Sequence, residues 1–175
     1  PSAPLAYSFP TSAQADTLTI RLERGYSYSP TEPIRLKLQV KDLEELRVST
    51  AGDAIVSGLT TDRLNLEASG AGKFTLNDLT AEELIIEVSG AGTITASGEV
   101  DSLVVEISGA STLNAGDLRA QSARIEISGM GKATLWAIND LSSSISGAGT
   151  VSYYGSPEVD QESSGLGTVT RLGDK

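Results

Sequence analysis

The fold is decided by a stretch that reads Leu84-Ile85-Ile86-Glu87-Val88-Ser89-Gly90-Ala91-Gly92-Thr93-Ile94-Thr95-Ala96. Two short segments rich in β-branched residues flank a Ser-Gly-Ala-Gly corner, and inward and outward positions alternate along each segment. Alternation with a period of two is typical of strands, and these segments are too short to be helices. The stretch therefore predicts two β-strands joined at a tight corner, where we expect glycine to supply a positive φ.

The same corner recurs seven times along the chain. Its first glycine, replaced by Thr50 in the first copy, lies at positions 50, 70, 90, 109, 129, 147 and 165. The steps of 20, 20, 19, 20, 18 and 18 residues are regular enough to be the coils of a solenoid. A solenoid winds continuously and so supplies the connections that parallel strands need. We therefore predict an all-β parallel β-helix of about seven coils, each 18–20 residues long.

Aligning the seven copies places aliphatic side chains in columns that repeat once per coil. Side chains two and four residues before the first glycine, and four residues after it, share the inward direction. The columns before the glycine end in polar residues, Ser143, Gln161 and Ser163, which suggests that the core tapers in the last coils. The predicted core columns are Val48, Ala68, Val88, Ile107, Ile127 and Ile145; Leu46, Leu66, Ile86, Val105 and Ile125; and Ala54, Phe74, Ile94, Leu113, Ala133, Val151 and Val169.

The N-terminal part of the chain lacks the repeat. Residues 1–15 hold three prolines, which indicates an extended arm. Alternating apolar residues at 18–22 and 34–40 predict two longer strands. Residues 16–41 are thus expected to cap an open end of the solenoid, residues 42–173 to form its coils, and residues 16–173 to form one domain.

Composition excludes several classes of function. The formal charge of −10 and pI near 4.4 argue against nucleic acid as a partner, because phosphate binding needs a basic surface. The chain has no His and no Cys, which excludes triads with a His base, thiol nucleophiles and the usual zinc sites. Its longest apolar runs fall well short of the ~20 residues that span a bilayer.

The repeat resembles a bacterial family, the putative auto-transporter adhesin, head GIN domain family. The likeness covers roughly residues 16–173 and includes the segments Val40–Leu46, Val151–Pro157 and Gly165–Val169. It implies a right-handed parallel β-helix at the cell surface or in the envelope, with a role in adhesion. The family supplies no catalytic residues, so none are assigned here.

Four carboxylates form the first candidate site. Glu67, Glu87, Glu106 and Glu126 each lie three residues before the first glycine, in consecutive coils. Such a ladder is typical of a solvated face that keeps the protein soluble. A divalent cation with oxygen ligands is the alternative, because stacked carboxylates repel each other.

Hydroxyl side chains form the second candidate, a flat array that resembles the faces of ice-binding solenoids. It includes Thr93, Thr95, Thr112 and Asn114, while Lys73 and Lys132 interrupt one of its rows. The alternative is that threonine simply favours strands and bonds across them.

The third candidate is aromatic. Trp136 and Tyr154 occupy the same column in neighbouring coils and are expected to point outward, with Tyr153 beside them. Stacked exposed rings could bind a sugar or a protein. The alternative is that a nearby loop or the C-terminus covers them.

These observations predict a protein that is not an enzyme and needs no cofactor or metal. It is expected to serve adhesion or structural self-assembly outside the cell, on its surface or in the envelope. The expected partner is a surface glycan, a surface protein or another copy of the protein bound end to end. We expect no binding to nucleic acid and no membrane span in this chain. The alternative function is binding of an extended polysaccharide or an ice-like crystalline surface.

Overall fold

The structure is a computed structural model that describes residues 11–14, 17–20, 40, 42–49 and 52–175. The chain forms two compact units, Pro1–Gln39 and Val40–Lys175. In the first unit, β1 (Thr11–Gln14) pairs antiparallel with β2 (Thr17–Ile20). Of the predicted arm over residues 1–15, residues 11–14 form β1 and the others lie outside the described residues. Of the predicted strand over 34–40, residues 34–39 also lie outside them.

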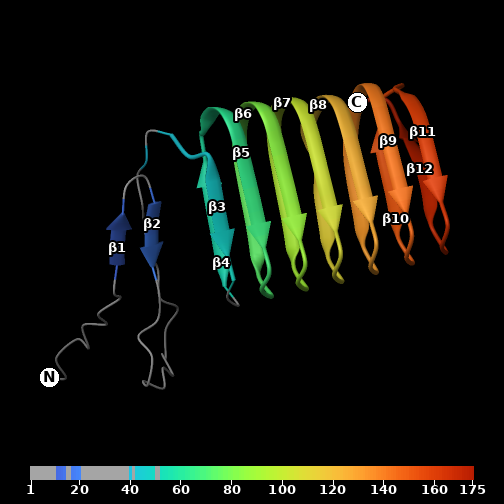
Figure 1. Ribbon diagram of the computed structural model, residues 1–175. Coiled ribbons are helices and arrows are strands. Elements are labelled where there is room, and N and C mark those ends of the chain that lie inside the picture. The colour runs from blue at the N-terminus through green and yellow to red at the C-terminus, as the bar shows by residue number, and fades with distance from the viewer. Residues whose placement is uncertain (1–10, 15–16, 21–39, 41, 50–51) are drawn as a thin grey trace, which may run out of the picture. The chain divides into compact units, whose positions relative to one another are not determined.

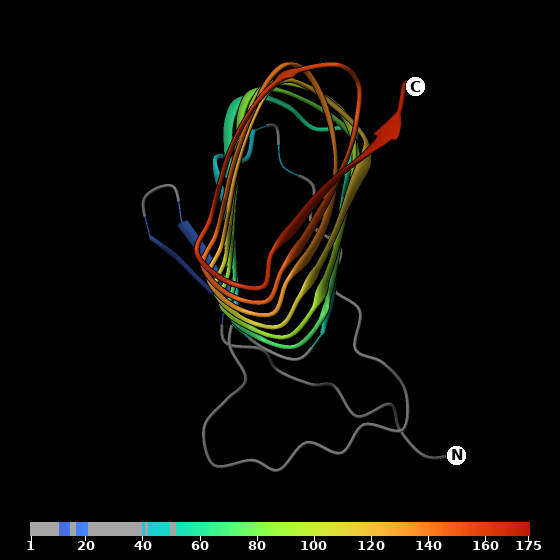
Figure 2. The ribbon, with the colours of Figure 1, turned by 90° about the vertical axis from the view of Figure 1, so that its right-hand side faces the viewer.

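The second unit is a stack of coils built from parallel strands, and the described residues contain no helix (Figure 1). Seen along the stack, the coils superpose as a flattened ring (Figure 2). Each strand pairs with the strand one coil away, which confirms the predicted β-solenoid. The strands are β3 (Glu45–Val48), β4 (Asp53–Ser57), β5 (Thr60–Ala68), β6 (Lys73–Val88), β7 (Thr93–Ile107), β8 (Thr112–Ile127), β9 (Lys132–Ile145), β10 (Thr150–Tyr154), β11 (Glu158–Ser163) and β12 (Thr168–Gly173).

The aliphatic columns fill the inside of the ring. Ile86, Val105 and Ile125 lie in register on β6, β7 and β8 and are at most 1% exposed. Burial of such stacked side chains is the main stabilising contribution that a coil makes to its neighbour. The core ends in the last coil, where Gln161 and Ser163 are exposed, as the sequence predicts. Ser143 differs because it is buried among the aliphatic residues.

Close approach of the backbone explains the glycines at the Ser-Gly-Ala-Gly corner. At Gly90, Gly109, Gly129, Gly147 and Gly165, an added Cβ would lie only 1.9–2.2 Å from the carbonyl oxygen of the corresponding glycine one coil earlier. Real Cβ atoms essentially never come within 3.0 Å of such an atom.

The glycine carbonyl is committed to a bond between coils. The Gly109 carbonyl accepts a hydrogen bond from the N–H of Met130 at 3.1 Å, and the Gly129 carbonyl accepts one from Ala148 at 3.1 Å. The expectation of positive φ at this corner is wrong. Among the described glycines, only Gly58, Gly98, Gly155 and Gly173 have positive φ, and all four lie elsewhere in the coils. The corner needs glycine for space and not for backbone conformation.

Coil length varies on the other side of the ring. The register shifts of β6 to β10 fall between Leu76 and Leu79, Thr95 and Ser97, Ala115 and Arg119, Ala120 and Ser122, and Tyr153 and Tyr154. The Ser-Gly-Ala-Gly corner stays in register from coil to coil, so insertions and deletions are absorbed at the shifts. This is the side on which irregular surface features form.

Gly129→Ala tests the constraint at the corner. We expect it to lower the free energy of unfolding by about 3 kcal/mol or more, because the new methyl group would push apart two bonded coils. Met130→Ala is the matched control at the next residue, which is 71% exposed, and should change stability by less than about 0.5 kcal/mol. Urea denaturation measures both, and equal midpoints for the two variants would contradict the explanation.

Ser143→Ala tests the polar residue in the core. The Ser143 side chain is 2% exposed and its Oγ has no hydrogen-bond partner among the described residues. Removing an unsatisfied buried hydroxyl should raise the free energy of unfolding by about 1 kcal/mol. Ser142→Ala, at the outward neighbour, should leave stability nearly unchanged. Destabilisation by Ser143→Ala in thermal or urea unfolding would show that the hydroxyl is bonded after all.

Candidate functional site

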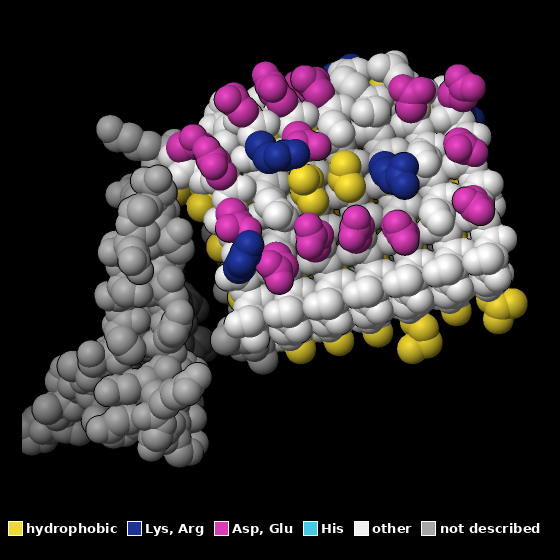
Figure 3. All heavy atoms as spheres, in the orientation of Figure 1, with side chains coloured by type: hydrophobic (Ala, Val, Ile, Leu, Met, Phe, Trp, Pro, Cys, Tyr) yellow, Lys and Arg dark blue, Asp and Glu magenta, His cyan; other side chains and the backbone are white. Residues whose placement is uncertain are grey.

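The four predicted glutamates form one straight row, here called the acid row. Glu67, Glu87, Glu106 and Glu126 pair directly in register across β5, β6, β7 and β8. They line a shallow groove of about 230 Å³ together with the outward serines of the next corner, and Figure 3 shows the row running along one face. The structure thus brings all four predicted residues together on one surface.

Arg47 adjoins the N-terminal end of the acid row. Its Nε lies 3.1 Å from Glu67 Oε2, and its guanidinium also bonds to Glu45. The hydrogen bond and charge of Glu45, followed by the charge of Glu67, raise the pKa of Arg47. Among the described residues, no three carboxylates converge in a way that could hold a metal ion. A cation on the acid row therefore stays a prediction.

A second acidic surface was missed by the sequence analysis. A groove of about 520 Å³ is lined by Asp62, Glu82 and Asp101, which occupy consecutive coils, together with Glu99 and Arg119. Arg119 Nη1 bonds to Glu99 Oε1 at 3.2 Å. Aspartates in short turns look like ordinary turn residues, so only the stacking of the coils reveals that they form a row.

The hydroxyl array forms two parallel rows, here called the hydroxyl rows. They lie on the wall of the ring opposite the acid row. Register pairs each member with its counterpart one coil away, so the rows are continuous from β6 to β12. Lys73 and Lys132 lie in the second row, as the sequence predicts. The rows are Thr75, Thr95, Asn114, Thr134, Ser152 and Thr170, and Lys73, Thr93, Thr112, Lys132, Thr150 and Thr168.

Trp136 and Tyr154 lie side by side at the irregular side of the ring. They are register partners on β9 and β10, and both are half-buried. Tyr153 takes a different direction, because it pairs with the buried Leu135 and packs against the core. The structure therefore brings two of the three predicted aromatic residues together, whereas the third is half-buried against the core.

The C-terminal Lys175 lies over this aromatic pair. Its Nζ is 5.6 Å from the centre of the Trp136 ring and 5.3 Å from that of Tyr154. The same ammonium donates to the Gly116 carbonyl at 2.6 Å and to the Asp117 carboxylate. The C-terminus is thus the cover of the pair, one of the two covers that the sequence leaves open. Gly116 and Asp117 cannot be recognised as partners of Lys175 from the sequence, because they lie 59 and 58 residues before it.

None of the described residues forms a helix that is both long and apolar enough to cross a membrane.

No curated protein matches the sequence. Solved structures share the fold. A putative adhesin from Bacteroides fragilis NCTC 9343 superposes with a TM-score of 0.89 at 23% identity, covering 94% of this chain and 76% of that one. A putative adhesin from Parabacteroides distasonis ATCC 8503 gives a TM-score of 0.64 at 23% identity, covering 73% and 60%. A putative lipid binding protein from the same organism gives a TM-score of 0.70 at 22% identity, covering 94% and 78%.

A family model supports the resemblance seen in the sequence. The model described as putative auto-transporter adhesin, head GIN domain matches residues 7–157, which include the first six copies of the corner and stop before the last coil. The match covers most of the chain. The protein therefore belongs to the putative auto-transporter adhesin, head GIN domain family.

Proposed function

We propose that this protein is a non-catalytic cell-surface or envelope protein that adheres through many weak contacts along its coils. The observation that carries the proposal is the unbroken register of the hydroxyl rows, in which one row presents a hydroxyl or amide side chain at every coil from Thr75 to Thr170. Strand spacing sets the repeat at about 4.8 Å. The family description, and the description of two similar structures as adhesins, support a role in adhesion.

Multivalency explains how such a surface would act. A single hydroxyl contact contributes little net free energy, because it replaces a hydrogen bond to water. Contacts held on one rigid framework add their effects, since binding at one coil raises the local concentration of ligand at the next. Backbone hydrogen bonds already fix the coils, so the backbone loses little conformational entropy on binding. The partner is then an extended surface glycan or protein with its own repeated groups.

The acidic residues support a role without catalysis. Glycoside hydrolysis needs two carboxyl groups in different environments, one of them with a raised pKa. The acid row instead consists of equivalent residues in equivalent positions on neighbouring strands. A row of this kind contributes charge and solubility to a surface.

End-to-end association is the structural version of the same proposal. Within the described second unit, β11 pairs only with β9, so its outer edge is open. Open strand edges add strands from other chains. Contact between copies through the ends would produce fibres, which present the rows many times over.

A pair of lysine substitutions tests adhesion by the hydroxyl rows. Thr95→Lys with Thr134→Lys places two long charged side chains on one hydroxyl row. Beads coated with this variant should bind bacterial or host cell surfaces at least about tenfold less than beads coated with the parent protein, because the loss is multiplied along the array.

Ser102→Lys with Ser142→Lys is the matched control, since it adds the same charge on the opposite wall at similarly half-buried positions. It should bind like the parent. Equal binding by all three proteins would refute adhesion through the hydroxyl rows. The same beads on polysaccharide-coated plates, and an ice-recrystallisation assay, separate glycan and crystal binding from binding to surface proteins.

A further inference from the structure

The ammonium of Lys175 contacts a set of groups that suits a cation. It meets a backbone carbonyl (Gly116), a carboxylate (Asp117) and the faces of two aromatic rings (Trp136 and Tyr154). A primary ammonium has three N–H donors and no acceptor, and aromatic faces attract cations. These four groups come from three coils, and two of them lie within a register shift of β8, so they are brought together only in the folded stack.

A bulge in β8 supplies the polar half of this site. Ala115 pairs with Leu135, but the next pair is Arg119 with Trp136, so residues 116–118 have no counterpart on β9. Leu118 of the bulge is fully buried, which fixes the segment to the core. Asp117 stays exposed beside it, and Gly116 lies against the Tyr154 ring, where an added Cβ would be 3.4 Å from a ring carbon.

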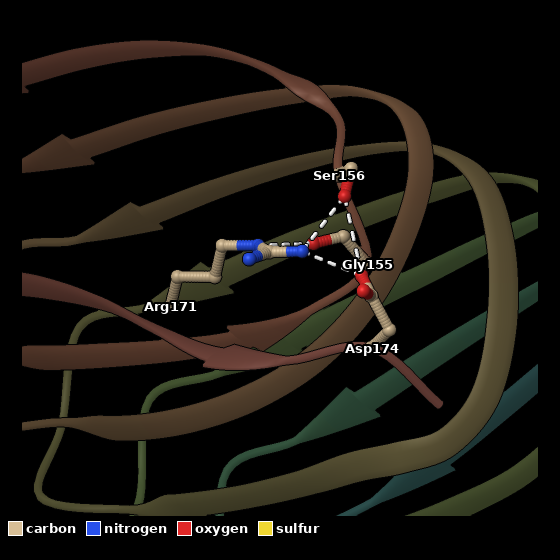
Figure 4. A network of polar contacts seen from close by, with 4 residues as sticks. All are labelled: Gly155, Ser156, Arg171 and Asp174. Atoms are coloured by element: carbon tan, nitrogen blue, oxygen red, sulfur yellow. Dashed lines mark hydrogen bonds and ion pairs between the residues drawn. The ribbon is translucent and has the colours of Figure 1, made fainter.

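The tail that carries Lys175 is held by contacts of its own. Arg171 donates from Nε to the Gly155 carbonyl at 2.7 Å, and from Nη2 to Ser156 Oγ at 2.7 Å and Asp174 Oδ1 at 2.5 Å (Figure 4). Ser156 Oγ also bonds to Asp174 at 3.2 Å. Gly173, with φ of 121°, lets the chain leave the ring of coils after β12 (Figure 2). The tail is thus anchored before Lys175, whose side chain is not needed to hold it.

We propose that Gly116, Asp117, Trp136 and Tyr154 form a binding site for a primary alkylammonium group, such as a lysine side chain of another protein, and that Lys175 occupies it as an internal ligand. The external ammonium competes with Lys175 for the same four groups. The site borders the hydroxyl rows, since Gly116 lies beside Thr134, but its four groups are not members of the rows and the proposal does not depend on the proposed adhesion. It would let one defined lysine of a partner dock at one place on an otherwise periodic surface.

Trp136 is the only tryptophan in the chain, so its fluorescence reports on this site alone. Lys175→Ala empties the site. Titration of this variant with Nα-acetyl-lysine N-methylamide should give a saturable change in fluorescence, whereas the parent should need at least about tenfold more ligand, because Lys175 competes at a high effective concentration. Lys132→Ala, which removes another exposed lysine, is the control and should behave like the parent.

Two further measurements establish the chemistry. Lys175→Ala combined with Asp117→Asn should bind about tenfold more weakly than Lys175→Ala alone, because the charged hydrogen bond is lost. Nα-acetyl-norleucine N-methylamide, which lacks the ammonium, should not bind. Butylamine in place of the lysine derivative shows whether a small free amine is accepted as readily as a lysine side chain of a protein.

The proposal is overturned if Lys175→Ala keeps its circular dichroism spectrum and shows no saturable response to the lysine derivative. Should that variant fail to fold, the parent provides the second measurement. Displacement of Lys175 by excess ligand should shift the Trp136 indole N–H resonance in the NMR spectrum, and an unchanged resonance would equally refute the site.

Discussion

The structure depends on a hydrogen bond between consecutive coils at the Ser-Gly-Ala-Gly corner. The carbonyl of the corner glycine in one coil accepts the N–H of the residue that follows the corner glycine in the next coil, as Met130 bonds to Gly109. The two backbones then lie so close that no Cβ fits between them. From Gly90 onward, this contact fixes the position of each coil against the next at one point of the ring. The position of every other residue in a coil then depends on its distance along the chain from the corner.

Fixed phase at the corner explains both the core and the surface rows. A residue at a given distance from the corner falls above its counterpart in the preceding coil, so Ile86, Val105 and Ile125 stack inside while Glu87, Glu106 and Glu126 stack outside. Aliphatic stacking is favourable by burial, whereas stacked carboxylates repel and are tolerated only because solvent screens them. The same geometry therefore produces a stable interior and a strongly patterned exterior. Patterned exteriors of this kind suit repeated weak contacts better than a single deep pocket.

The opposite side of the ring is where the coils differ from one another. Register shifts gather there, and one of them leaves Gly116 and Asp117 of β8 without partners on β9, near Trp136. The C-terminal tail crosses the same region and brings Lys175 to it. The corner, which is the same in each coil, thus maintains the fold. The side that varies between coils can form a binding site that occurs only once in the stack.

A period that can be counted along the chain predicts the solenoid, its coil length, the core columns and the alignment of Glu67, Glu87, Glu106 and Glu126. The same period predicts that Trp136 lies beside Tyr154. The prediction of positive φ at the corner glycines is wrong. A need for positive φ and a lack of space both favour glycine, and only the distance between coils distinguishes the two causes. Tyr153 beside the core, the hidden hydroxyl of Ser143 and the position of Lys175 were decided by tertiary structure. They depend on register shifts and on contacts between residues up to 59 positions apart. Neither of these produces a repeating pattern in the sequence.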